Sequence, residues 1–194
     1  MLQRFVGAVT NPIDGAATAV IVLAKFALPL LIIRFPFTAG WANFVLDSFD
    51  GDLLIPLGLP DAIYQPIDKL ADWATYVAIV VLGYRDRWPI RKLMFGLFVF
   101  RSVGQASFLA TGDELLLAFF PNFLEPLFLV TASILAWERA IRRAPQWRDR
   151  GFAFLHRHRW LIGTLIVLYK LQDEYVTHVA NLDRSDLLRQ LLGG

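Results

Sequence analysis

The chain contains no cysteine among its 194 residues and only three histidines. The lack of cysteine excludes disulfide bonds, a thiolate nucleophile, and metal or iron–sulfur sites held by thiolates. The scarcity of histidine excludes membrane enzymes built on clustered histidines, and it argues against haem or chlorophyll ligation because His178 is the one histidine in an apolar stretch. The chain also lacks a Gly-x-Ser-x-Gly segment, which is typical of serine hydrolases. We therefore expect no cofactor.

Charged residues are also scarce. They make up 19% of the chain against 56% hydrophobic residues, and the mean hydropathy is +0.49. This composition is too apolar for a soluble domain and indicates a polytopic membrane protein. Because roughly 20 apolar residues cross the hydrocarbon layer as a helix, the sequence predicts an all-α integral membrane fold with a single domain over residues 1–194. A bundle of about five transmembrane helices is expected, at 16–36, 64–84, 91–111, 114–137 and 160–181. The polar start of the second span has an alternative interpretation, as a helix lying on the membrane surface.

Positive charge is absent from residues 37–63, which carry four aspartates. Arginine instead gathers in the connections 85–92 and 139–159. By the positive-inside rule both connections are cytoplasmic, which puts the N-terminus in the cytoplasm and the C-terminus outside. We therefore expect a multi-pass protein of the plasma or inner membrane whose partner is the lipid bilayer. Because the basic residues lie between spans, we expect no nucleic acid.

Ionisable residues lie near the middle of the apolar stretches, where a charge costs at least about 2.5 kcal/mol. The third and fourth spans are joined by a Gly-Asp turn, so they form an antiparallel hairpin. Counting back from this turn puts Arg101 and Glu125 both roughly 17 Å deep. An ion pair between them would relieve two costly desolvations. Lys25 and Lys170 fall in the same layer by the same count.

Two polar stripes lie above this layer. Asp68 with Asp72, and Lys170 with Glu174 and His178, are spaced at intervals of four residues, so each set shares one helix face. Asp72 is level with Glu174, and Asp68 with His178, so we expect an acidic vestibule that leads to a cationic layer. Asp68, Asp72, Glu174 and His178 also form a candidate metal site with oxygen and imidazole ligands. The alternative is a purely structural network.

The fourth span contains Phe120-Pro121-Asn122-Phe123-Leu124-Glu125-Pro126. Because proline cannot donate a backbone hydrogen bond, the carbonyls of Leu117 and Asn122 become free at membrane depth beside Glu125. Broken helices of this kind recur at ion and substrate sites. The sequence predicts a broken helix at Pro121–Pro126, which is either part of a site or a plain kink.

Residues 47–52 have the sequence Asp-Ser-Phe-Asp-Gly-Asp, which is similar in composition to a calcium-binding loop. The order differs from that of an EF-hand, because Phe49 takes the third position and Gly51 the fifth. We interpret the segment as an aspartate-rich turn.

These observations favour a small membrane protein that moves or binds a small ion or a proton-linked solute. Glu125 and Glu174 are the expected proton or cation carriers, because burial and a neighbouring cation shift a carboxyl pKa in opposite directions. Two classes of alternative remain: an accessory or structural subunit of a larger membrane complex, and an intramembrane lipid-processing enzyme at the outer leaflet. The sequence is compatible with a homo-oligomer and with a larger membrane complex. The expected ion- or solute-binding residues are Asp68, Asp72, Asn122, Glu125 and Glu174, and the expected counter-charges are Lys25, Arg101 and Lys170.

Overall fold

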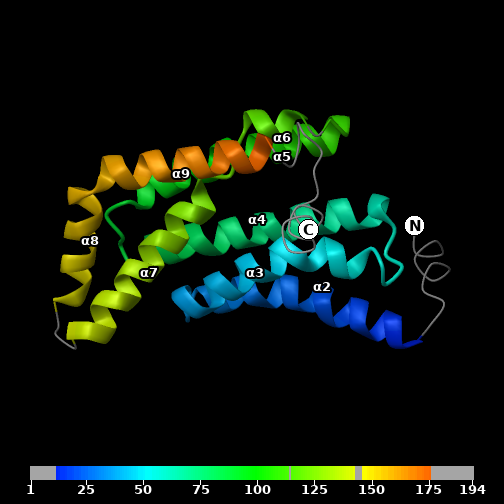
Figure 1. Ribbon diagram of the computed structural model, residues 1–194, viewed down its shortest axis with the longest axis horizontal. Coiled ribbons are helices and arrows are strands. Elements are labelled where there is room, and N and C mark those ends of the chain that lie inside the picture. Colours follow the sequence, from blue (N-terminus) through cyan, green and yellow to red (C-terminus); the bar gives the residue numbers. More distant parts are fainter. Residues whose placement is uncertain (1–11, 114, 143–145, 176–194) are drawn as a thin grey trace, which may run out of the picture. The chain divides into compact units, whose positions relative to one another are not determined.

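The computed structural model describes residues 12–113, 115–142 and 146–175. Within these ranges the chain forms eight α-helices and no strand, which confirms the predicted all-α class (Figure 1). They are α2 (Pro12–Ile32), α3 (Pro36–Leu54), α4 (Asp61–Arg85), α5 (Arg91–Thr111), α6 (Leu115–Phe119), α7 (Leu124–Arg142), α8 (Trp147–Arg157) and α9 (Arg159–Glu174). The chain divides into two compact units, Met1–Leu82 and Gly83–Gly194.

Two of the described helices are long and apolar enough to cross a membrane: the segment Gly15–Ile32 of α2, and α5. The five-span bundle expected from the sequence is therefore not confirmed. The other three expected spans fall short for separate reasons. α4 begins with several charged residues, the fourth span is divided between α6 and α7, and the described part of α9 has 16 residues.

One helix was missed by the sequence analysis. Residues 37–63 were expected to contain no span, yet α3 occupies Pro36–Leu54, with a proline in its first turn where no intrahelical donor is required. The aspartate-rich turn predicted at 47–52 is wrong as well, because these residues are helical. The helix buries Asn43 and Asp50 along with Ala39 and Leu54, so part of its inward face is polar.

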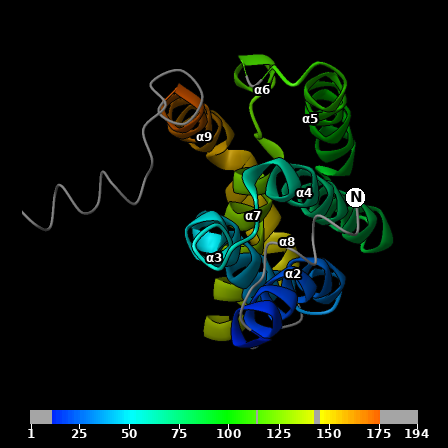
Figure 2. The same ribbon diagram turned by 90° about the vertical axis from the view of Figure 1, so that its right-hand side faces the viewer.

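The first unit is built from α2, α3 and α4. α2 and α3 are joined by a turn after Ile32 and lie side by side in both views (Figures 1 and 2). Short connections join each helix to the next, so consecutive helices run in opposite directions. Leu54, Leu59 and Ile79 form the apolar part of the interior, each at most 1% exposed.

The second unit contains the predicted interruption of the fourth span. α5 ends at Gly112, whose φ of 73° is the left-handed cap that glycine accommodates, and α6 follows. The helix is then broken between Phe119 and Leu124. α5 approaches this break closely, because a Cβ at Gly104 would lie 2.4 Å from the Cβ of Phe120.

Candidate functional site

The candidate site is centred on Lys25 of α2, which is 4% exposed within an otherwise apolar segment. Its Nζ donates to the carboxylate of Asp50, to Oδ1 of Asp68 at 2.5 Å and to Oδ1 of Asp47 at 3.3 Å. Asp47 and Asp50 come from α3 and Asp68 from α4, so one ammonium group joins all three helices of the unit. Three carboxylates give the buried ammonium the charge-assisted hydrogen bonds that burial requires.

Two further side chains surround this centre. The Tyr64 hydroxyl donates to Oδ1 of Asp50 at 3.0 Å, and the Tyr64 ring lies 5.7 Å from the Lys25 Nζ. Lys69 donates to Oδ2 of Asp68 at 2.7 Å and lies 3.8 Å from the Asp72 carboxylate. Asp68 therefore binds two lysines, one on each carboxylate oxygen.

The cluster has more carboxylates than ammonium groups. Asp47, Asp50, Asp68 and Asp72 stand against Lys25 and Lys69, so with all groups ionised the cluster carries two excess negative charges. One carboxylate oxygen each from Asp47, Asp50 and Asp68 lie within 4.8 Å of one another. Oxygen atoms of this type are the ligands that hard cations prefer, and protonation of a carboxylate would reduce the same excess.

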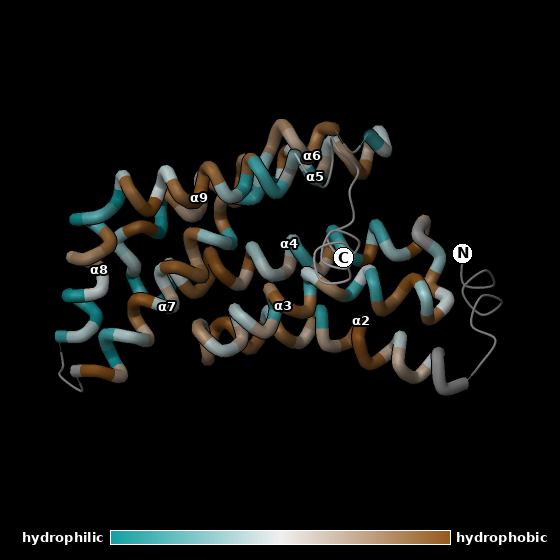
Figure 3. The backbone as a smooth tube through the Cα atoms, in the orientation of Figure 1, coloured by the Kyte–Doolittle hydropathy of each residue, from teal (hydrophilic) through white to brown (hydrophobic). Residues whose placement is uncertain are grey.

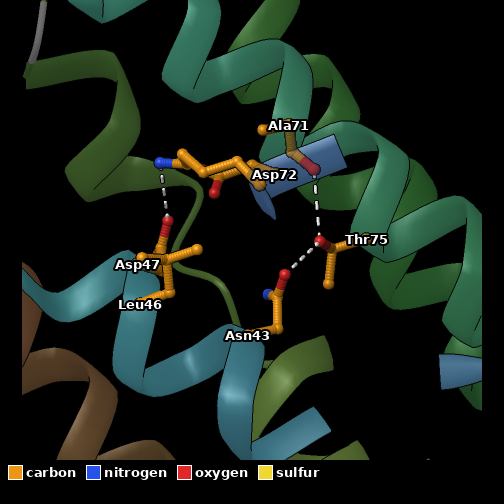
Figure 4. A pocket seen from close by; sticks show the side chains of 7 residues that line it. Asn43, Leu46, Asp47, Ala71, Asp72 and Thr75 are labelled. Atoms are coloured by element: carbon orange, nitrogen blue, oxygen red, sulfur yellow. Dashed lines mark hydrogen bonds and ion pairs between the residues drawn. The ribbon is translucent and has the colours of Figure 1, made fainter. Parts of the chain in front are cut away.

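A polar recess lies beside Lys25 between α3 and α4 (Figure 4). The side chains that line it are Lys25, Asn43, Leu46, Asp47, Ala71, Asp72 and Thr75. The Thr75 hydroxyl is 3.4 Å from Oδ1 of Asn43 and donates to the Ala71 carbonyl at 3.1 Å, which closes one side of the recess. The recess is too narrow for a water molecule, so a solute larger than a proton enters only if these side chains move.

Sequence reasoning identified part of this cluster. The structure brings together Lys25, Asp68 and Asp72, which were predicted site residues, but it adds Asp47 and Asp50, which were assigned to a turn. The missed signal was the spacing of Asn43, Asp47 and Asp50, which follows the helical period. An apolar periodicity would have revealed α3, but this stripe is polar.

In the second unit, Arg101 of α5 is 4% exposed and contacts the helix break. Its Nη1 donates to the Leu117 carbonyl at 3.1 Å and to the Phe120 carbonyl at 2.7 Å. The Leu117 carbonyl is one of the two that the prolines were predicted to free. The predicted ion pair between Arg101 and Glu125 stays a prediction.

Asn122 and Glu125 lie next to each other at the start of α7. Oδ1 of Asn122 accepts from the backbone N–H of Glu125 at 3.3 Å, and Nδ2 donates to Oε2 of Glu125 at 3.2 Å. The first contact caps the helix. Asn122 therefore has a structural role at the break beside the predicted role in binding.

The remaining predicted residues lie on α9 and beyond it. Lys170 forms an ion pair with Asp173, one turn away on the same helix, at 2.5 Å. Glu174 ends α9, but its side chain is outside the described part of the structure, as is all of His178. The acidic vestibule formed by Asp72 and Glu174, and the metal set that includes His178, thus stay predictions.

The chain matches no protein family model, no curated protein and no solved structure. The geometry of the two units is therefore the basis for any functional assignment.

Proposed function

We propose that the chain is a multi-pass membrane protein that binds or moves a small cation or a proton-linked solute through the charged cluster of its first unit. The observation that carries this proposal is Lys25, buried in an apolar helix long enough to span a membrane and held by three carboxylates. A single buried lysine needs one carboxylate for neutrality. The two excess carboxylates add a cost that a structural network avoids, and a bound proton or cation relieves that cost.

The helix α3 changes the expected number of passes. It has 19 residues and is thus about 28 Å long, close to the hydrocarbon thickness. It runs back along α2, so we count it as a pass. With α2, α4, α5, the broken pair α6–α7, and α9, the chain then crosses six times.

With six passes, each connection on the cytoplasmic side contains arginine. Arg34 lies in the turn between α2 and α3, and the connections 85–92 and 139–159 are also basic. All three fall on one side if consecutive helices cross in opposite directions, in agreement with the positive-inside rule. Both termini are then outside, whereas five passes put the N-terminus in the cytoplasm.

Exposed apolar side chains support burial in lipid. On α2 Val20, Leu23 and Leu30 are each at least 66% exposed, and on α9 Leu161, Leu165 and Leu168 also face outward. Hydrophobic residues run along most of α2 (Figure 3). A bilayer is the solvent that such faces require, because apolar surface of this extent is unfavourable in water.

The proposed route enters the cluster at its outer end. Asp47 lies seven residues before the end of α3, and Asp68 lies seven residues after the start of α4, so both are roughly 10 Å from the same end of the unit. The Asp47 side chain is 32% exposed, whereas that of Asp50 is fully buried. A proton or cation first meets Asp47 and then the buried pair Asp50 and Asp68. Lys25, which contacts all three, shifts between them as the charge arrives.

The charged side chains of the cluster contact one another. An accessory subunit would instead direct its polar faces toward a partner, so this arrangement favours a function of the chain itself. No observation in the described residues favours the lipid-processing enzyme.

Flux measurements in liposomes test the proposal. The purified full-length chain is reconstituted in liposomes that contain an indicator for pH or for the metal ion under test, and proton, sodium, potassium, magnesium or calcium gradients are imposed. We expect the wild type to transport at least one of these ions. Asp68→Asn should abolish the flux, since it removes a carboxylate that contacts both lysines. Asp86→Asn is the matched control, because Asp86 pairs with Arg85 in the exposed connection. Absence of wild-type flux under every gradient contradicts the transport proposal.

Reporter fusions test the topology separately. A reporter after Ala144 should remain cytoplasmic, and one at Gly194 should be exported. A reporter at the N-terminus distinguishes the two counts of passes: export supports six passes, and retention supports five and would remove α3 from the spanning helices.

A further inference from the structure

The region from Trp147 to Trp160 forms a surface separate from the charged cluster. It comprises α8 and the first residues of α9, and it contains four arginines against one aspartate. Arg150, Arg157 and Arg159 are all exposed. Hydrophilic residues are concentrated along α8 in Figure 3. The sequence of this surface therefore carries a net positive charge.

Aromatic side chains are interleaved with these arginines. Trp160 is 79% exposed and Phe154 is 47% exposed. The Arg159 guanidinium lies 5.6 Å from the Trp160 ring centre, and that of Arg139 lies 5.8 Å from the Trp147 ring centre. Tryptophan beside arginine is typical of the headgroup level of a bilayer, where an apolar ring and a charged donor are both satisfied.

The opposite face of α8 fixes this surface in place. Gly151 packs against α7 so closely that a Cβ there would lie 2.7 Å from a methyl group of Leu135. Phe152 contacts the ring of Trp88, with centroids 5.8 Å apart. Packing on one face of α8 thus fixes the helix, and the arginines on its other face stay close together without a bound partner.

The direction of α9 places the surface at the end of an apolar helix. The chain bends at His158, which ends α8 and precedes α9, and α8 runs crosswise to α9 (Figure 1). Beyond Trp160, α9 exposes Leu161, Leu165 and Leu168. A basic, aromatic surface beside an apolar helix that leaves it at a steep angle matches a helix in the membrane plane joined to one that enters the hydrocarbon.

We propose that α8 and the first turn of α9 form a docking surface for anionic phospholipid headgroups of the cytoplasmic leaflet. This inference rests on the membrane insertion in the proposed function but not on transport. Arginine suits this partner because its planar fork donates two hydrogen bonds to phosphate oxygens. The basic connection 85–92 lacks an exposed tryptophan, since Trp88 is 3% exposed and stacks on Phe128.

Quenching by brominated lipids tests the surface in the full-length protein. The chain in neutral detergent micelles is titrated with brominated phosphatidylglycerol or brominated phosphatidylcholine, and tryptophan emission is recorded. Wild type should be quenched at a lower mole fraction of phosphatidylglycerol than of phosphatidylcholine. Because each basic residue near an anionic surface contributes about fivefold in affinity, a triple Arg150→Gln, Arg157→Gln, Arg159→Gln variant should weaken phosphatidylglycerol binding roughly 100-fold.

The matched control is Arg85→Gln, Arg87→Gln, Lys92→Gln, which removes the same charge from the connection that buries its tryptophan. This control should keep the preference for phosphatidylglycerol. Equal quenching of wild type by the two lipids, or equal loss in both variants, overturns the proposal. Displacement of the lipid by glycerol 3-phosphate would assign the surface to free phosphate instead, and tighter binding of a structured RNA than of phosphatidylglycerol would assign it to nucleic acid. Flux through the liposomes described above has no bearing on these outcomes.

Discussion

The two units stabilise their buried cations by different means. In the first unit, Lys25 is held by side-chain carboxylates from α3 and α4, which lie 22 to 43 residues away in the sequence. In the second unit, Arg101 donates to the backbone carbonyls of Leu117 and Phe120, and Lys170 pairs within its own helix. The first arrangement consists of ionisable groups, whereas the second includes carbonyls that cannot change charge.

This difference determines which of the two arrangements can respond to a proton or a cation. A carboxylate cluster can gain or lose a proton or cation, and its lysine can then change partners. A guanidinium bound to carbonyls keeps the same charge at every physiological pH, because arginine stays protonated and a backbone carbonyl does not ionise. The proposed ion handling therefore concerns the first unit, whereas Arg101 donates to two carbonyls at the helix break.

The largest expected effect comes from removing Lys25. Lys25→Leu leaves three carboxylates, two of them buried, without their shared ammonium, which should lower the free energy of unfolding by about 3 to 5 kcal/mol. Arg85→Leu is the control, because its ion pair with Asp86 is partly exposed and should cost about 1 kcal/mol or less. Unfolding in mixed micelles, followed by circular dichroism, measures both. Equal losses would show that the cluster is no more demanding than a local ion pair.

A smaller effect is expected from Arg101. Arg101→Leu removes two hydrogen bonds from the helix break and should cost about 2 to 3 kcal/mol. A double-mutant cycle with Glu125→Leu tests the predicted ion pair. In the Glu125→Leu variant, a partner arginine would stay buried without its carboxylate. If the two side chains are partners, the double variant should therefore be at least as stable as Glu125→Leu, because it removes that arginine as well. Simple addition of the two losses would show that Arg101 and Glu125 act independently.

The sequence predicted the features that depend on local chemistry. Gly112 marks the end of α5 because a left-handed residue is required there, and Pro121 marks the helix break because it lacks a donor. Lys25 and Asp68 were identified because a charge in an apolar stretch needs a partner. These inferences require no knowledge of which helices are neighbours.

The features that depend on neighbours were missed. α3 has no apolar stripe because its inward face carries Asn43 and Asp50, so hydrophobic periodicity could not reveal it. The partners that make this face stable in the interior are the Lys25 ammonium of α2 and the Tyr64 and Thr75 hydroxyls of α4. For Arg101 the sequence suggested a carboxylate partner, although the freed carbonyl of Leu117 was already known as an acceptor. A buried guanidinium can donate to backbone carbonyls as well as to carboxylates, so the carbonyl contact adds to the predicted ion pair and does not test it.

Packing at the helix break gives the next prediction. Gly104→Ala places a Cβ 2.4 Å from the Cβ of Phe120, an atom that cannot move without its backbone, so it should destabilise by about 1 to 3 kcal/mol. Gly96→Ala is the control on the same helix, since a Cβ there meets nothing within 4 Å, and it should stabilise by up to about 1 kcal/mol. Thermal unfolding of both variants in detergent measures the contrast. If both alanines act alike, α5 does not rest against the break.

The smallest expected effect separates the two contacts of Asn122. Asn122→Ala removes the cap on the Glu125 N–H and should cost about 1 kcal/mol. Asn122→Asp keeps an oxygen acceptor for that N–H. It also replaces Nδ2, which donates to Oε2 of Glu125 in the wild type, with a second carboxylate oxygen. The aspartate variant should therefore be close to wild type in acid, where carboxylates are protonated, and should lose stability as the pH rises. In the first unit Asn43→Ala should cost less at any pH, because Asn43 meets Thr75 across 3.4 Å and Thr75 also donates to the Ala71 carbonyl. Unfolding measured across the pH range decides the point: a pH-independent aspartate variant would mean that the Asn122–Glu125 side-chain contact contributes nothing, and that the cap alone fixes the start of α7.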